Sequence, residues 1–124
     1  MIRVLVVDDE PAYCESLRLL LSCEGFAVFT AANAQEALDV GADYPIDLLV
    51  VDWILRDQMD GVDVAAALQA ANPRMQVIVI SGWPSGELEA RVEALPFAQC
   101  LHKPFAGEAI LSAAHEATAL DVEP

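Results

Sequence analysis

Five polar residues stand where apolar runs of the chain end, and their types are those that bind a metal ion and a phosphoryl group. They are Asp8, Asp9, Asp52, Ser81 and Lys103, which is the only lysine among 124 residues. Carboxylates that converge repel one another, so either one stays protonated or a cation neutralises them. Oxygen ligands at a site open to water suit Mg²⁺ better than zinc. The residues therefore predict a magnesium site with a fixed ammonium beside it.

A carboxylate beside a divalent ion and an ammonium can accept a phosphoryl group. The two cations neutralise the charge on the transferring oxygens while a carboxylate oxygen attacks in line and forms an aspartyl phosphate. Asp52 is the expected nucleophile, because it stands alone at the end of its run. Asp8 and Asp9 are then the expected metal ligands.

These residues converge only if the apolar runs form one parallel sheet. Apolar runs and helical repeats alternate along the whole chain, and no linker or internal repeat separates them. Such alternation predicts right-handed crossovers and a doubly wound α/β fold of five βα units, with helices on both faces of the sheet. Ligands in this fold bind beyond the carboxyl ends of the strands, where the strand order reverses. The expected strands are 2–8, 26–30, 46–51, 76–80 and 98–101. The expected helices begin at 11, 34, 62, 85 and 106, and the last two are expected to end at 95 and 120.

Local signals place the helix ends. Pro11 is suited to the first turn of a helix, and Gly25 is suited to the position that follows a helix. Asn33 with Glu36 three residues later has the form of a capping box. Asn72 and Pro73 are expected to end the helix that begins near Val62.

Composition limits the function. With 56% hydrophobic residues, the chain is expected to form one globular domain, and a net charge of −14 argues against a basic surface for nucleic acid or anionic membrane. No stretch reads as a signal peptide or membrane helix, so a cytoplasmic location is expected. Three cysteines without a CxxC pair predict neither a disulfide framework nor a zinc site. A metal cluster of Cys100, His102 and His115 is not expected, because Cys100 and His102 are predicted to face opposite sides of a strand.

Four segments carry a family resemblance. In their order and separation, VLVVDDEP, LLVVDW, VIVISGW and LHKPF resemble the receiver domain of two-component response regulators of the chemotaxis-regulator type. The resemblance covers essentially the whole chain. It implies a flavodoxin-like five-stranded sheet of order 2-1-3-4-5 and a single receiver domain over residues 1–124, with a core of about 2–120 and no output domain in this chain.

The resemblance also implies roles for individual residues. Asp52 would be the phosphoacceptor, and Mg²⁺ would be held by Asp8, Asp9, Asp52 and the backbone carbonyl of Ile54. Ser81 and Gly82 would bind the phosphoryl group, and Ser81 would turn toward it as a switch. Lys103 would be its counter-ion, aimed inward by a cis peptide at Pro104, since only bonds that precede proline adopt cis at low cost.

The chain departs from the usual family pattern at three places. The segment WILRDQMDG, which follows the phosphoacceptor, lacks the usual proline. Cys100 stands where the family commonly has an aromatic switch residue. Ile54 and Trp83 are bulky apolar residues at positions that line the approach to the phosphoryl group, so slow self-dephosphorylation is expected.

The expected function is a signalling switch that a histidine kinase or phosphotransfer protein phosphorylates on Asp52. The switch would bind a downstream protein through its last two helices and the strand between them, and it would not be an enzyme with an external product. One alternative is a pseudo-receiver, a binding module without phosphorylation. A second is a phosphohydrolase of the haloacid-dehalogenase type, although such enzymes carry a DxD motif at the first strand. Dinucleotide binding is excluded, because DDEP offers no glycines to admit a pyrophosphate.

Overall fold

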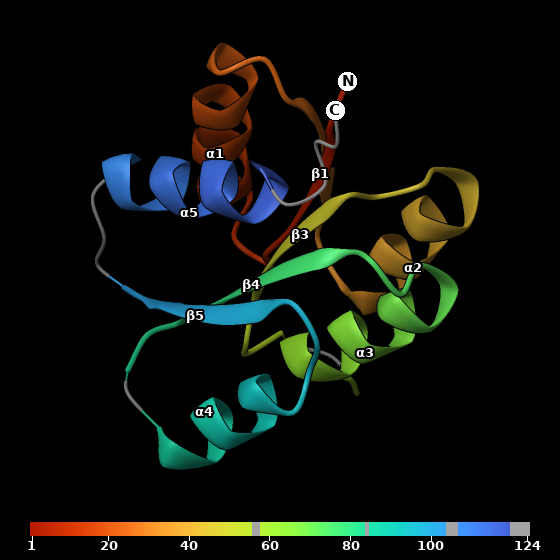
Figure 1. The fold of residues 1–124 in the computed structure, drawn as a ribbon, viewed down its shortest axis with the longest axis vertical. Coiled ribbons are helices and arrows are strands. Elements are labelled where there is room, and N and C mark those ends of the chain that lie inside the picture. Colours follow the sequence, from red (N-terminus) through yellow and green to blue (C-terminus); the bar gives the residue numbers. More distant parts are fainter. Residues whose placement is uncertain (56–57, 84, 104–106, 120–124) are drawn as a thin grey trace.

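The computed structural model describes residues 1–55, 58–83, 85–103 and 107–119, in which strands and helices alternate as predicted (Figure 1). The strands are β1 (Arg3–Val7), β2 (Ala27–Ala31), β3 (Leu48–Asp52), β4 (Gln76–Ser81) and β5 (Ala98–His102). The helices are α1 (Pro11–Cys23), α2 (Ala34–Asp43), α3 (Gly61–Ala71), α4 (Gly86–Glu93) and α5 (Gly107–Ala119).

The strands form one parallel sheet in the order β2-β1-β3-β4-β5, which confirms the predicted doubly wound topology. The order reverses between β1 and β3, where successive crossovers leave in opposite directions. Because all strands run the same way, their carboxyl ends lie along one edge of the sheet. The residues singled out by the sequence follow or end these strands, so the topology gathers them at this edge.

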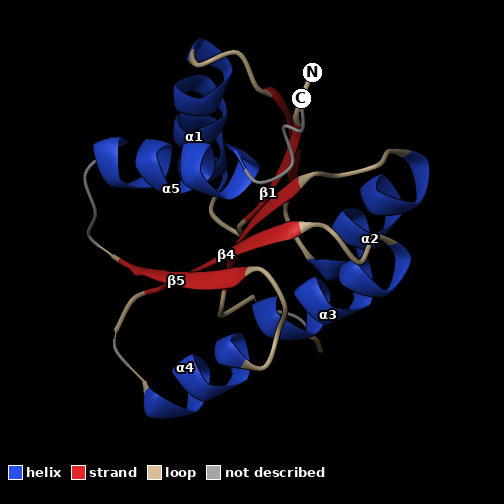
Figure 2. Ribbon diagram, viewed as in Figure 1, coloured by secondary structure: helices blue, strands red, loops and turns tan. Residues whose placement is uncertain are grey.

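Helices cover both faces of the sheet, α1 and α5 on one face and α2, α3 and α4 on the other (Figure 2). Alternate residues of each strand enter the two cores. In β1, Leu5 and Val7 pack with the α2–α4 side, whereas Val4 and Val6 pack with the α1–α5 side. This alternation decides the helix layer toward which each residue at the sheet edge turns.

Most helix ends follow the predicted signals. Pro11 opens α1, and Gly25 has a φ of 92°, a left-handed value that glycine adopts without strain. Asn33 caps α2 by accepting a hydrogen bond from the Glu36 amide, but the Glu36 carboxylate accepts from the Ala32 amide, one residue before the position that a capping box requires. Asn72 is the C-cap of α3 as expected.

Two helices differ from their predicted bounds. The helix α3 begins at Gly61, one residue earlier than predicted, because Asp60 and Asp63 form a reciprocal capping box. The helix α4 is shorter than the predicted span of 85–95, since Ser85 is its N-cap and Ala94 its C-cap. The predicted ends of the last helix, residues 106 and 120, lie outside the described residues, as does Pro104 with its predicted cis peptide.

The prediction that Cys100 and His102 face opposite sides of their strand is wrong, because residues two apart share one side of a strand. Cys100 packs against the α2–α4 core, and His102 lies 3.8 Å from the Glu89 carboxylate of α4. His115 lies on the other side of the sheet, 3.0 Å from Glu24. A cluster of Cys100, His102 and His115 is therefore absent from the described residues for a different reason, which is the separation of the two faces.

Gly61 tests how tightly the segment after β3 is packed. A Cβ atom added there would lie 2.3 Å from the backbone oxygen of Asp52. We expect Gly61→Ala to lower the free energy of unfolding by about 1–3 kcal/mol, because backbone must shift to admit the methyl group. Gly86→Ala is the matched control, since nothing lies within 4 Å of its added Cβ, and it should change stability by less than about 1 kcal/mol. Equal denaturant midpoints for the two variants would contradict this packing.

Candidate functional site

Backbone hydrogen bonds hold two of the charged residues just beyond the last assigned residue of their strands. The Asp8 amide donates to the Ala31 carbonyl at 3.1 Å, and the Lys103 amide donates to the Ser81 carbonyl at 2.7 Å. Each bond extends the ladder with a neighbouring strand by one residue. Asp52 is the last residue of β3 and is paired with Ile80. Hydrogen bonding within the sheet therefore fixes the backbone positions of Asp8, Asp52 and Lys103.

The three predicted carboxylates converge. One oxygen from each of Asp8, Asp9 and Asp52 lies within 4.8 Å of the others. The Lys103 ammonium is 3.7 Å from an Asp8 oxygen and 3.6 Å from an Asp52 oxygen, which are ion-pair distances longer than a good hydrogen bond. One ammonium thus faces three acidic groups, and the cluster needs a further positive charge or a proton.

Burial and mutual repulsion disfavour the ionised carboxylates. Burial, followed by the charge of Asp8, raises the pKa of Asp52 to about 6, although Lys103 and a backbone hydrogen bond from Ile54 oppose the shift. Burial also raises the pKa of Asp8, against a hydrogen bond from the Glu10 amide and the charge of Lys103. Both groups therefore give up a proton less readily than an ordinary aspartate, and a bound metal ion would favour their ionised forms.

The cluster fits a hard divalent cation. Asp8 is only 2% exposed, and one of its carboxylate oxygens has no hydrogen-bond partner. A buried carboxylate oxygen without such a partner is costly, and an ion bound among the three acidic side chains would satisfy it. Because the donors are all oxygens and the site is partly open, Mg²⁺ suits it better than a softer metal.

Sequence reasoning missed Tyr13. The Lys103 ammonium lies 4.2 Å from the centroid of the Tyr13 ring, within the range of a cation–π contact. Burial, together with the charges of Asp8 and Asp52, raises the pKa of Tyr13 to about 12, so the ring remains a neutral phenol. The available signal was the position of Pro11. A helix that begins two residues after Asp9 places its third residue, Tyr13, close to the carboxyl edge of the sheet.

A pocket of about 190 Å³ opens above the acidic cluster. The predicted residues that line it are Asp9, Asp52, Ile54, Gly82, Trp83 and Lys103, and Glu10 and Trp53 also contribute to its wall. Ile54 is 48% and Trp83 is 57% exposed, so both apolar side chains border the entrance. A larger pocket of about 480 Å³ lies at the amino ends of β1 and β2 and contains none of the predicted site residues.

Ser81 is placed differently from the other predicted residues. It is 1% exposed, and its hydroxyl donates to the Trp83 carbonyl and accepts from the Trp83 amide. Like Val79 and Val77, two and four residues earlier, it occupies the α2–α4 side of its strand. The structure thus brings Ser81 to the correct edge but binds its hydroxyl to the loop that leads into α4.

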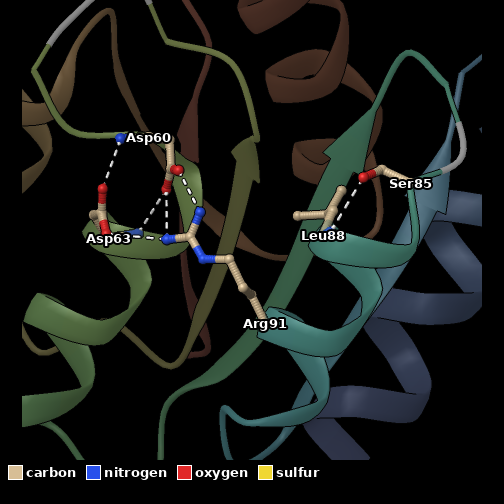
Figure 3. A network of polar contacts seen from close by, with 5 residues as sticks. All are labelled: Asp60, Asp63, Ser85, Leu88 and Arg91. Atoms are coloured by element: carbon tan, nitrogen blue, oxygen red, sulfur yellow. Dashed lines mark hydrogen bonds and ion pairs between the residues drawn. The ribbon is translucent and has the colours of Figure 1, made fainter.

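An ion-pair network joins α4 to the segment that follows Asp52 (Figure 3). Arg91 of α4 donates to both oxygens of Asp60, at 2.6 and 3.3 Å, and to Asp63 at 3.1 Å. Asp60 is also the N-cap of α3, so Arg91 binds the same carboxylate that fixes the end of the segment after Asp52. The pKa of Asp60 is lowered by hydrogen bonds from Arg91 and the α3 amides, which outweigh its burial. Sequence reasoning did not identify this network.

Cys100, at the expected aromatic position, is half-buried against the α2–α4 core and is paired with Val79 in the sheet. It therefore lies on the same side as Ser81 and α4. A thiol is smaller than an aromatic ring, so the Cys100 side chain fills less space beside α4 than the expected aromatic residue would.

Comparisons with known proteins agree with this geometry. The family model of the response regulator receiver domain matches residues 4–115. The chain therefore belongs to the response regulator receiver family. Within the described segments, every helix is too short or too polar to cross a bilayer.

Two curated relatives show the extent of the similarity. The cell cycle transcriptional regulator CtrA of Caulobacter vibrioides is 35% identical over 91 residues, which cover 73% of this chain and 38% of that protein. A putative NtrX-like response regulator of Rickettsia bellii is 34% identical over 108 residues, which cover 85% of this chain and 22% of that protein. The chain thus spans less than half the length of either relative.

Solved structures share the whole fold. A CheY-like receiver domain of Methanospirillum hungatei has a TM-score of 0.87 at 29% identity, with 98% of this chain and 94% of that chain covered. The chemotaxis protein CheY4 of Vibrio cholerae has a TM-score of 0.86 at 24% identity, with 94% and 98% covered, and supports the fold alone.

The raised pKa of Asp52 has a consequence for stability. Its value is about 6 in the folded protein against 3.8 for an ordinary aspartate, so between these pH values the folded state binds a proton that the unfolded chain has lost. The free energy of unfolding should therefore fall as pH rises through this window. In EDTA near neutral pH we expect Asp52→Asn to melt at a higher temperature than the parent, with the difference shrinking toward pH 4.

Mg²⁺ should reduce the difference in melting temperature between Asp52→Asn and the parent. The ion stabilises the ionised cluster of the parent more than that of Asp52→Asn. Differential scanning calorimetry with and without Mg²⁺ measures both effects. A metal-free parent that melts above Asp52→Asn near neutral pH would contradict the electrostatic account of the site.

Proposed function

We propose that this receiver domain is a phosphorylation-activated switch that accepts a phosphoryl group on Asp52 from a histidine kinase or phosphotransfer protein. The observation that carries the proposal is the convergence of Asp52 with two further carboxylates and the only lysine, beneath an open pocket. This arrangement supplies a nucleophile, a cation site and a counter-ion within one small space.

In the proposed reaction, a carboxylate oxygen of Asp52 attacks phosphorus, and the bond from phosphorus to the donor histidine nitrogen breaks. Mg²⁺, when held by Asp8, Asp9, Asp52 and the Ile54 carbonyl, would supply charge neutralisation of the transferring oxygens. Lys103 is close enough to Asp52 to pair with an oxygen of the phosphoryl group as charge leaves the carboxylate. Gly82 adds no side chain to the pocket wall, so its backbone is accessible to the group.

The proposed switch begins at Ser81. Turning the hydroxyl toward the phosphoryl group breaks its two hydrogen bonds to the Trp83 backbone, and Trp83 lies two residues before the N-cap of α4. The start of α4 would then rearrange. Since Cys100 replaces the usual ring, the ion pairs from Arg91 to Asp60 offer a second connection between α4 and the phosphoacceptor segment.

The proposed output is a protein contact. We propose that the surface formed by α4, β5 and α5 binds a downstream protein, because it includes the rearranging helix α4 and the strand β5 against which α4 packs. Residues 1–124 are proposed to form a single receiver domain, with a core of about 2–120, that acts in the cytoplasm without an external substrate and without binding nucleic acid. The only chemistry proposed is its own phosphorylation and dephosphorylation.

One observation favours a second candidate. Ser81 binds the Trp83 backbone, and Cys100 offers no ring, so the fold could serve as a pseudo-receiver that binds a partner without phosphorylation. The haloacid-dehalogenase alternative has no such support, because Asp8 and Asp9 are adjacent and the family match is to receiver domains.

Intact-mass spectrometry after incubation with acetyl phosphate and Mg²⁺ tests the proposed function. We expect one phosphoryl adduct on the parent and on the control variant Asp39→Asn, whose side chain is exposed on α2, but none on Asp52→Asn. Lys103→Ala should acquire the adduct at least about tenfold more slowly, because it lacks the fixed counter-ion. An unlabelled parent, under conditions that label a known receiver, would favour the pseudo-receiver.

The apolar entrance predicts a long-lived aspartyl phosphate. Ile54 and Trp83 border the path that an attacking water must take to the phosphorus. We expect Ile54→Asn and Trp83→Ala to accelerate self-dephosphorylation severalfold, measured as loss of the phosphoryl adduct after removal of acetyl phosphate. Leu19→Ala, at an exposed leucine on α1, is the control and should leave the decay unchanged. Unaltered decay in both pocket variants would refute the shielding role.

The proposed route through α4 predicts local spectral changes. We expect beryllofluoride with Mg²⁺ to shift the backbone amide NMR signals of residues 85–93, because the Trp83 backbone loses its contacts to Ser81. Ser81→Ala should abolish most of this change, and Arg91→Met should broaden or move the same signals before any ligand is added. Matching α4 spectra of the parent with and without beryllofluoride would contradict the route.

A further inference from the structure

We infer that Tyr13 is a positioning residue for the phosphorylation of Asp52, because its ring face holds the Lys103 ammonium between the two carboxylates. The inference rests on the proposed function. Tyr13 adds a residue of α1 to the site residues, which otherwise come from the ends of β1, β3, β4 and β5. The inference depends on a contact made by the only lysine in the chain.

The distances show why a positioning group is needed. The ammonium lies 3.7 Å from Asp8 and 3.6 Å from Asp52, so neither carboxylate holds it at hydrogen-bond distance. A lysine side chain is a flexible stem with a strongly hydrated charge at its tip, and holding it in one place costs rotamer entropy. With the side chain 24% exposed, water competes for the ammonium.

The Tyr13 ring meets this need. A cation within about 6 Å of an aromatic centroid is attracted by the negative face of the ring, and here the distance is 4.2 Å. The ring also excludes water from one side of the ammonium, which strengthens its pull on the nearby carboxylates. Because the contact occupies no carboxylate oxygen, the ammonium can move onto an arriving phosphoryl oxygen without breaking a short hydrogen bond.

Strand alternation explains why the ring comes from α1. Leu101 packs with the α1–α5 side of the sheet, and Lys103 is two residues further on, so it shares that side. The same holds for Val6 and Asp8 in the first strand. Pro11 starts α1 two residues after Asp9, and the first turn of the helix then places the Tyr13 ring against the Lys103 ammonium.

The single lysine allows a test that does not depend on phosphorylation. In protein labelled with ¹³C-lysine, only Lys103 gives signals, and a ring 4.2 Å away should move its ε-methylene protons upfield. We expect the upfield shift in the parent and in Tyr13→Phe, and its loss in Tyr13→Leu. Tyr44→Leu, at the other tyrosine, is the control and should retain the shift. Absence of the upfield shift in the parent would overturn the contact and, with it, the inference.

The functional arm measures the initial rate of phosphorylation by acetyl phosphate at saturating Mg²⁺. We expect Tyr13→Phe to remain within about twofold of the parent, and Tyr13→Leu to fall about three- to tenfold, the range of a partly desolvated cation–π contact. In a Lys103→Ala background, Tyr13→Leu should cause no further loss, because the ring acts through the ammonium. Thermal melts of each variant show whether the fold is retained.

The outcomes separate the two claims. A parent that is not phosphorylated contradicts the proposed function, and the positioning role falls with it even when the upfield shift is present. A phosphorylated parent whose Tyr13→Leu variant reacts at the parent rate overturns the inference alone. Equal losses in Tyr13→Phe and Tyr13→Leu assign the effect to the hydroxyl and contradict the ring contact. A further loss from Tyr13→Leu without Lys103 would show a merely structural role.

Discussion

The structure depends on the electrostatic balance of three carboxylates and one ammonium at the carboxyl edge of the sheet. A parallel sheet brings Asp8, Asp9 and Asp52 together whether or not their charges are compatible, because the strand backbones determine where the side chains begin. Burial, together with the charge of Asp8, raises the pKa of Asp52, and Lys103 offsets only part of this shift. The fold thus holds a cluster that is short of positive charge, and this deficit favours the binding of a cation.

Because side chains alternate along each strand, the residues at the carboxyl edge of the sheet fall into two groups that face different helix layers. Asp8 and Lys103 turn toward the α1–α5 layer, where Tyr13 lies against the ammonium. Ser81 and Cys100 turn toward α4, as their strand neighbours do. The two sides are joined by the Lys103 amide, which donates to the Ser81 carbonyl, and by the segment that follows Asp52, whose end at Asp60 is held by Arg91 of α4. Under the proposed function, this division would let a change at Asp52 reach α4 on the other side of the sheet.

The fold could be predicted from the sequence because its signals are local. Continuous apolar runs, Pro11 and Gly25 are each sufficient to place a strand or a helix end, and alternation then dictates a parallel sheet. The acidic cluster followed from the same reasoning. Tyr13 and the network of Arg91 with Asp60 did not, because each is a contact between residues far apart in the chain. The hydroxyl orientation of Ser81 was equally inaccessible, since it is set by the backbone of the loop at Trp83. The incorrect placement of Cys100 and His102 came from a misapplied strand period and not from missing information.

The most direct test of the central claim is calorimetric titration of Mg²⁺ into the metal-free protein near neutral pH, with Asp9→Asn as the site variant and Asp39→Asn as the control. The charge deficit predicts one binding site in the parent and in Asp39→Asn, with affinity at least about tenfold weaker in Asp9→Asn because one of the three carboxylates is neutralised. Equal affinity in Asp9→Asn, or no binding by the parent, would show that the cluster does not hold a cation and would contradict the account of the site.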